Sequence, residues 1–278
     1  MRGVFFRMMK CCLYRHFAAD PFFNMAFDEC MLESVLRRPG LILLRLYTWR
    51  EGAITFGCNQ EIERAVCRSR LGGTSLIRRV TGGRAVYHDI SELTYAVAVN
   101  TETDELRKWA GSVTSIYLRL AEGLQAYLDS TGIATKLVRR SSDQRALSVN
   151  TACIPCFGSA ARYELLANGT KVVASAQRQV AGALLQHGSI KLDGVAAHPA
   201  LPGGSISDAQ PQLLTKSRFD GLAGRFGSAL GRVLGCEPEK FVPIPIPAKS
   251  LRARLDQVRS EPLVRRDVFE HSATSISL

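Results

Sequence analysis

The stretch from Arg78 to Asp89 reads RRVTGGRAVYHD. Apolar Leu76-Ile77 precedes it, and the run Leu93–Val99, which is rich in β-branched and aromatic residues, follows it and is typical of a buried strand. The adjacent glycines Gly82 and Gly83 permit positive φ angles and close approach of the backbone to a ligand. The sequence therefore predicts two strands that flank a tight glycine loop.

The residues around these glycines suit the loop to holding an oxygen atom. Backbone N–H groups in such a loop can cradle a carbonyl or phosphate oxygen. Arg78, Arg79 and Arg84 add planar donors with fixed positive charge, and His88 follows closely. Composition alone also allows an ordinary hairpin loop with solvated arginines, because Gly-Gly pairs are common in turns.

Length and composition limit the class of protein. The 278 residues are 46% apolar, enough for one large domain or two small ones with a sizeable core. No apolar run approaches the roughly 20 residues that cross a bilayer, and no cleavage pattern follows the interrupted apolar start, so we expect neither a signal peptide nor a membrane segment. The eight cysteines include a single Cys153-x-x-Cys156 pair, which predicts reduced thiols in a cytoplasmic protein.

The net charge of +11 at pH 7 favours an acidic partner. The basic residues are scattered, and no nucleic-acid-binding motif is present, so we do not expect a nucleic acid. Acidic small proteins, such as acyl carrier protein and lipoyl domains, suit this charge, and so does a merely soluble basic surface.

Local patterns predict alternating strands and helices. Asp20-Pro21 is typical of a helix start, and Asn168-Gly169 is typical of a hairpin turn. The remaining helices are expected at 105–128, 213–234 and 251–258. Strands are expected at 13–17, 41–47, 53–57, 133–138, 163–166, 171–177 and 182–192. Residues 139–150 and 199–211 are expected to be loops, the first of them mobile, and 241–247 an extended connector.

The stretch 78–89 resembles the Arg-Arg-x-x-Gly-Gly-x-x-Val-x-His-Asp motif of the superfamily of lipoate–protein ligases, lipoyl/octanoyltransferases and biotin–protein ligases. Arg84 stands where typical lipoate ligases have a third glycine. In this respect the motif of this sequence most resembles that of LipM-type octanoyltransferases. Further strings of the superfamily resemble residues 24–29, 45–49, 57–60, 171–179 and 186–189. Two departures are Ala174, where glycine is usual, and Gln179 after Arg178.

The resemblance covers roughly residues 14–195 and implies an α+β fold. The expected architecture is that of the class II aminoacyl-tRNA synthetase and biotin–lipoate ligase catalytic domains, with mixed β-sheets surrounded by helices. We expect one catalytic domain at 11–263, an N-terminal extension at 1–10 and a disordered tail at 264–278.

The resemblance also implies a cysteine nucleophile. Cys156 stands where LipM-type enzymes place their catalytic cysteine, and Cys153 is its nearest rival. Lys171 would stabilise the thiolate and move protons between the leaving thiol and the attacking amine. Without the resemblance, an isolated cysteine is usually a small core residue and an isolated lysine a solvated one.

The loop at Gly82-Gly83, with His88, would hold the acyl carbonyl oxygen. Arg78 and Arg79 would either bind the phosphate of a pantetheine arm or brace the loop. A lone histidine such as His88 or His187 is more often structural, and His187 is interpreted in that way.

The implied function is transfer of an octanoyl group from acyl carrier protein to a lysine of a lipoyl domain or glycine cleavage H protein, without ATP or metal. The alternatives are an ATP-dependent lipoate–protein ligase, an enzyme that moves octanoyl groups between lipoyl domains, and a non-catalytic subunit that binds lipoyl domains.

Overall fold

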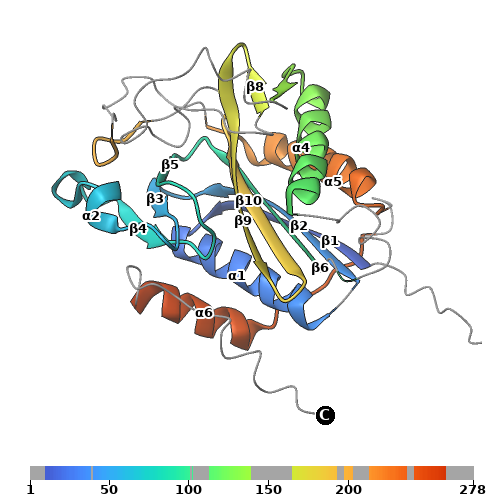
Figure 1. The fold of residues 1–278 in the computed structure, drawn as a ribbon, viewed down its shortest axis with the longest axis horizontal. Coiled ribbons are helices and arrows are strands. Elements are labelled where there is room, and N and C mark those ends of the chain that lie inside the picture. Colours follow the sequence, from blue (N-terminus) through green and yellow to red (C-terminus); the bar gives the residue numbers. More distant parts are fainter. Residues whose placement is uncertain are drawn as a thin grey trace, which may run out of the picture.

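The computed structural model describes residues 10–38, 40–100, 102, 113–138, 165–192, 197–202, 213–236 and 241–260. Its strands form two sheets (Figure 1). The larger sheet has the order β1 (Lys10–Ala19), β2 (Leu41–Trp49), β6 (Leu93–Asn100), β10 (Ala183–Ile190), β9 (Thr170–Val180), β8 (Leu165–Ala167) and β7 (Lys136–Leu137). The smaller sheet has the order β4 (Ser75–Arg78), β3 (Ala53–Phe56) and β5 (Val86–His88).

Helices cover both faces of the larger sheet, as Figure 1 shows. The helices α1 (Pro21–Arg37) and α6 (Ala248–Ser260) lie on one side, and α4 (Val113–Ser130) and α5 (Lys216–Val233) lie on the other. The short helix α2 (Ile62–Ala65) and the 3₁₀ turn Arg68–Arg70 lie beside the smaller sheet. Strands β1 and β2 are parallel whereas β2 and β6 are antiparallel, so the sheet is mixed and the fold is α+β, as predicted.

Burial on both faces explains the continuous apolar sequence of the central strands. Every residue of β2 and β6 is buried. Along β2, Leu44 and Leu46 pack in the cluster under α4 and α5, whereas Leu43 and Tyr47 pack in the cluster under α1 and α6. A strand covered on both sides has no polar face, so its sequence does not alternate.

The local signals for α1 and for the β8–β9 turn are confirmed. Asp20 Oδ1 accepts a hydrogen bond from the Phe23 N–H at 3.0 Å, and Pro21 is the first helical residue. Asn168 and Gly169 have φ angles of 50° and 77°, the left-handed values that an Asn-Gly hairpin turn requires. The helix predicted at 213–234 is α5, and the one predicted at 251–258 is the longer α6.

Other expectations are corrected. The strands that directly flank the glycine loop, β4 and β5, belong to the same small sheet, but each pairs with β3, so the loop is not a hairpin. The strand predicted at 93–99 is β6 of the larger sheet. The strand expected at 133–138 forms only at Lys136–Leu137. The predictions missed β5, α2 and the 3₁₀ turn, which are too short for periodicity to reveal.

Several predictions fall on residues outside the described ranges. These are the first part of the 105–128 helix, the loop at 139–150, most of the 199–211 loop and the tail from 264. Within the described ranges, no helix is both long and apolar enough to cross a membrane.

Candidate active site

The glycine loop after β4 is braced by two arginines. Arg79 donates from Nη2 to the carbonyl oxygens of Gly82 at 2.8 Å and Arg84 at 2.7 Å, and from Nε again to Gly82. Arg78 donates from Nη1 to the carbonyl oxygens of Cys58 and Gln60, both at 3.0 Å. Arg78 is therefore held on the turn that follows β3, while Arg79 holds the loop itself.

Glycine is required where this loop meets the 57–60 turn. A Cβ atom on Gly57 would lie 2.2 Å from the carbonyl oxygen of Gly83, which no relaxation of a flexible side chain could relieve. Gly83 itself has φ of +93°, in the region that favours glycine. The two segments therefore pack backbone against backbone.

A pocket of about 410 Å³, counting its open mouth, lies beside the loop. Gly83 and Arg79 line it from the loop, His88 from β5, and Ala174 and Ala176 from β9. Tyr47 and Thr55 also line it, so the strands 41–49 and 53–56 contribute to its wall. A concave site with apolar walls and a few placed polar groups is the usual form of a small-ligand site.

One buried chain of hydrogen bonds reaches the loop from α1. His187 on β10 contacts Asp28 Oδ2 through Nδ1 at 2.9 Å and Thr81 Oγ1 through Nε2 at 2.6 Å. Burial alone would raise the pKa of Asp28, but Arg45 and His187 lower it below its ordinary value, so the carboxylate stays charged. Asp28 thereby keeps a proton on His187 Nδ1, and His187 orients the first residue of the loop.

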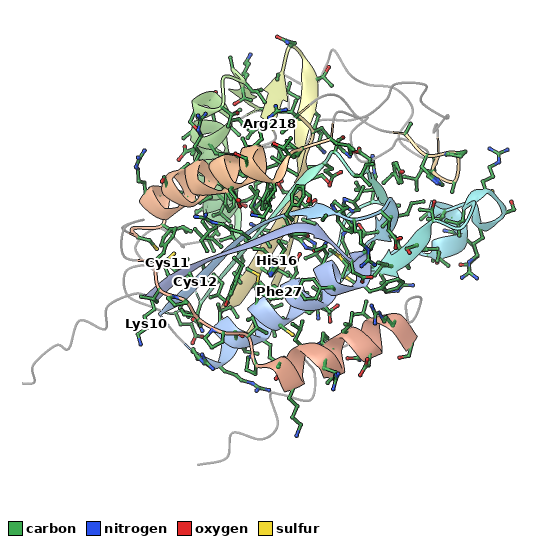
Figure 2. All side chains as sticks on the ribbon, turned by 180° about the vertical axis from the view of Figure 1, so that it is seen from behind. Lys10, Cys11, Cys12, His16, Phe27 and Arg218 are labelled. Carbon is green, nitrogen blue, oxygen red and sulfur yellow. The ribbon has the colours of Figure 1, made fainter. Side chains whose placement is uncertain are left out.

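Arg45, the cation at the start of this series of hydrogen bonds, is fully buried. Arg45 donates to Asp28 Oδ1 at 2.7 Å and to the carbonyl oxygen of Asn24 at 2.8 Å. Its guanidinium lies over the rings of Tyr47 and Phe27, at 3.9 and 4.6 Å from their centroids, an arrangement that stabilises a desolvated cation. Figure 2 shows Phe27 of α1 close to His16 of β1, which accepts from Arg45 Nε.

A second buried chain passes through His88. Its Nδ1 contacts Glu92 Oε1 at 2.7 Å, and its Nε2 contacts Thr55 Oγ1 at 2.7 Å. Burial opposes the charge on Glu92, yet Lys191 and His88 lower its pKa to about 2. The carboxylate therefore stays charged and accepts a hydrogen bond from the N–H at Nδ1 of His88. Nε2 of His88 then accepts a hydrogen bond from the Thr55 hydroxyl. The Thr55 oxygen in turn accepts a hydrogen bond from Arg79 Nη1 at 3.1 Å.

The environment of His88 keeps its ring neutral. Burial lowers the pKa of His88 below its ordinary value, although Glu92 acts in the opposite direction. The Trp49 ring stacks on it with a centroid distance of 4.2 Å, and Trp49 Nε1 donates to Thr94, which donates to Glu92. Burial also disfavours charge on Lys191, but Glu92 and Asp89 raise its pKa, so the ammonium persists.

Lys171 owes its placement to a β-bulge. Leu166 lies opposite Lys171 and Leu165 opposite Val173, so Val172 is an extra residue in β9. Val172 and Val173 both pack against the cluster under α4 and α5, which two successive residues of a regular strand cannot do. The interrupted alternation places Lys171 on the face of the sheet that carries the pocket.

The structure thus brings some predicted site residues together. Arg79, Gly83 and His88 line one pocket, Gly82 supplies a carbonyl oxygen to Arg79, and Arg78 lies behind the loop. Lys171 is buried on β9, three residues before the lining residue Ala174. Cys153 and Cys156 lie outside the described residues.

The sequence interpretation missed four residues that support the pocket: Asp28, Thr55, Glu92 and Lys191. Asp28 belongs to the quoted string 24–29, and the spacing of Glu92, four residues after His88, was the other available signal. Among the residues that the structure describes, no three His, Cys, Asp or Glu side chains converge to hold a metal ion.

Residues 20–199 match the family model of the lipoyl protein ligase A/B catalytic domain. The match spans well over half of the 278 residues. The chain therefore belongs to the lipoyl protein ligase A/B catalytic domain family.

Within this family, the chain is similar to proteins named octanoyltransferase LipM. It is 34% identical over 177 residues to the protein of Staphylococcus epidermidis and 37% identical over 183 residues to that of Brevibacillus brevis. Each aligned region covers 63% of this chain and 63% of the relative.

Solved structures show the same fold at lower identity. The bi-partite lipoate protein ligase of Thermoplasma acidophilum has a TM-score of 0.65 at 18% identity, covering 94% of this chain and 99% of that chain. A lipoate–protein ligase A with bound ATP has a TM-score of 0.64, also at 18% identity, covering 90% of this chain and 95% of that one. At this identity the similarity shows the fold alone, and it confirms the predicted architecture.

Proposed function

We propose that this chain is an octanoyltransferase of protein lipoylation. It would move an octanoyl group from acyl carrier protein, through a thioester on Cys156, to a lysine of a lipoyl domain or glycine cleavage H protein. The similarity to relatives named octanoyltransferase LipM supports this activity. The observation that carries it is the convergence of the braced glycine loop and the bulged strand of Lys171 on one pocket.

The octanoyl group would move in two steps, first from the donor to Cys156 and then from Cys156 to the acceptor lysine. The thiolate of Cys156 attacks the donor thioester carbon, a C–S bond to the enzyme forms, and the donor leaves as a thiol after taking up a proton. The acceptor lysine then attacks the enzyme thioester as a free amine, forming an amide, and its proton passes to the Cys156 sulfur. Lys171 would supply and accept these protons, and its ammonium would favour the thiolate.

The glycine loop would bind the oxyanion of both transfers. Arg79 fixes the carbonyl oxygen of Gly82, and in a trans peptide the N–H of the next residue points in the opposite direction. The Gly83 N–H is therefore directed away from the guanidinium, where it can donate to a substrate oxygen. Donors held in advance of the reaction stabilise developing charge without reorganisation.

In this proposal Arg78 and Arg79 would brace the loop, and His88 would have a supporting role. Nε2 of His88 already accepts from Thr55 when Glu92 holds the proton on Nδ1, so His88 would act on the oxyanion through Thr55 and Arg79. The octanoyl chain would occupy the pocket beside Gly83, against residues 174–176 of β9 and 187–189 of β10. The net charge of +11 suits acidic donors and acceptors, and the free thiols of the six described cysteines suit a reducing cytoplasm.

Mass spectrometry of the intact protein mixed with octanoyl-carrier protein, without ATP, tests this proposal. We expect an octanoyl adduct that hydroxylamine removes, that Cys156→Ala abolishes and that the matched control Cys153→Ala retains. Addition of an acceptor domain should transfer the group to its lysine. Strict dependence on ATP with free octanoate or lipoate would instead indicate a ligase, and binding of lipoyl domains without any transfer would indicate a non-catalytic subunit.

A further inference from the structure

Helix α5 carries a row of arginines along its outer face. Arg218, Arg225 and Arg232 are exposed and recur every seven residues, or about two helical turns, so they share one side of the helix. Gly221 and Ser228 occupy the intervening positions of the same stripe and leave the guanidinium groups prominent. The opposite side of α5 is buried in the core. Figure 2 shows Arg218 at the end of the helix near β8 and β9.

The stripe keeps its positive charge. The sole acidic residue of α5 is Asp220, and Lys216 contacts it at 2.6 Å. Within the part of the chain that the structure describes, no carboxylate lies within 4.0 Å of the three arginines of the row. Arg225 donates to the carbonyl oxygen of Ser130 at the end of α4, which fixes the middle of the row against that helix.

A groove runs beside the first half of this row. It encloses about 890 Å³, counting its open side, and is lined by Arg218, Arg225, Leu222, Ile133 and Leu192. Leu192 follows Lys191, whose N–H donates to the carbonyl oxygen of Val172 at 2.9 Å. This end of the groove therefore lies beside the last residues of β10 and their partner strand β9, on the side of the sheet covered by α4 and α5.

We propose that the arginine row of α5 is the docking surface for the acyl donor, an acidic carrier protein, whose negatively charged helix would lie along α5. Its thiol-bearing arm would follow the groove, where guanidinium groups would pair with the arm's phosphate and Leu192 and Leu222 would contact its apolar part. This inference rests on the proposed function. Complementary charge explains the choice of occupant. A row of cations that has no carboxylate partner among the described residues attracts and orients an anionic surface.

Charge reversal tests the surface. The double variant Arg218→Glu/Arg232→Glu leaves Arg225 and its bond to Ser130 in place. The matched control Lys249→Glu/Arg252→Glu makes the same change of charge at exposed positions of α6. The readouts are kcat/KM with octanoyl-carrier protein, kcat/KM with the uncharged small donor octanoyl-pantetheine, and the Kd of carrier protein measured by fluorescence anisotropy at several salt concentrations.

We expect the α5 variant to lose at least about tenfold in kcat/KM with the carrier protein and in affinity for it, and to lose most of the salt dependence. In the α5 variant, kcat/KM with octanoyl-pantetheine, which has no phosphate and no carrier surface, should fall far less than kcat/KM with the carrier protein. The α6 control should behave as the wild type with both donors. Equal losses in both variants, or none in the α5 variant, would overturn the docking surface.

The binding measurement separates this inference from the proposed function. If neither donor is turned over but carrier protein binds and the α5 variant alone weakens it, the transferase proposal fails and the docking surface stands. If octanoyl-pantetheine is turned over but the wild type does not bind carrier protein, the docking surface fails. Tighter binding of nucleic acid than of carrier protein at α5 would also overturn it.

Discussion

Two buried chains of side chains support the glycine loop, and they have the same order of chemical groups. Each runs from a cation to a carboxylate, an imidazole and a threonine hydroxyl. The first consists of Arg45, Asp28, His187 and Thr81, and the second of Lys191, Glu92, His88 and Thr55. Both histidines line the pocket, so both chains act on the same site from different sides.

The chains differ at their two ends. The first ends on Thr81, a residue of the loop, whereas the second reaches the loop only through Arg79. Among the described residues, Asp28 is the one carboxylate that pairs with Arg45, whereas Lys191 contacts both Glu92 and Asp89. The first chain of hydrogen bonds therefore fixes the position of the loop and depends on Asp28 alone for its counter-charge. The second holds charge near the pocket, and there Asp89 is a reserve partner that can pair with Lys191 if Glu92 is lost.

Asp28→Ala should give the largest loss of stability. It leaves the fully buried Arg45 without a counter-charge and removes a partner of His187 and Tyr47, which typically costs about 3–5 kcal/mol. Chemical denaturation measures the change in free energy of unfolding, with Asp256→Ala on the exposed face of α6 as control. A loss below about 1 kcal/mol would show that Arg45 does not depend on this pair.

Glu92→Gln should cost less than Asp28→Ala. Asp89 stays near the Lys191 ammonium at 3.3 Å, and the amide still offers an oxygen to His88, so the loss should be about 1–3 kcal/mol. The same denaturation experiment measures it. If the Glu92 variant is the less stable of the two, Asp89 does not act as the reserve partner.

Acid should destabilise the second chain in two stages. The pKa of His88 is lowered from 6.5 by burial, so the unfolded state binds more protons and stability falls as the pH drops below 6.5. The pKa of Glu92 is lowered from 4.5 to about 2, so a further loss follows below pH 4.5.

His88→Gln removes the first of these two stages. Its stability should therefore change less than that of the wild type between pH 6.5 and 4.5, as measured by unfolding at a series of pH values. An unchanged slope would mean that His88 binds protons equally in the folded and unfolded states.

Sequence predicts the parts of this site whose residues are close together in the chain, and it misses contacts between residues that are far apart in the chain. The glycine loop, Arg79 and His88 were predicted because turn residues and short strings are local signals. The contact of Asp28 with His187 joins residues 159 apart, and that of Glu92 with Lys191 joins residues 99 apart. No helical or strand period encodes such pairs, so the resemblance of residues 24–29 to a superfamily string gives Asp28 no partner.

The face of the sheet on which Lys171 lies also depends on a distant partner strand. Regular alternation places Lys171 on the same face as Val173 and away from Ala174, and only the register shift opposite β8 reverses this. A bulge depends on the pairing of two strands, so one strand's sequence does not reveal it. The fold was better predicted, because burial of β2 and β6 on both faces leaves a plain apolar run.

Two matched threonine variants give the smallest expected change in stability and the finest comparison of the chains. Thr81→Val and Thr55→Val each remove one buried hydroxyl with little change of shape, so each should cost about 1 kcal/mol in unfolding free energy. Their effects on the proposed octanoyl transfer should differ, because Thr81 belongs to the loop and Thr55 acts through Arg79. Thr81→Val should lower kcat more than Thr55→Val does, with little change in KM. Because the stability costs match, equal kcat values would mean that the loop is positioned by Arg79 and the Gly57 contact, with no contribution from His187 through Thr81.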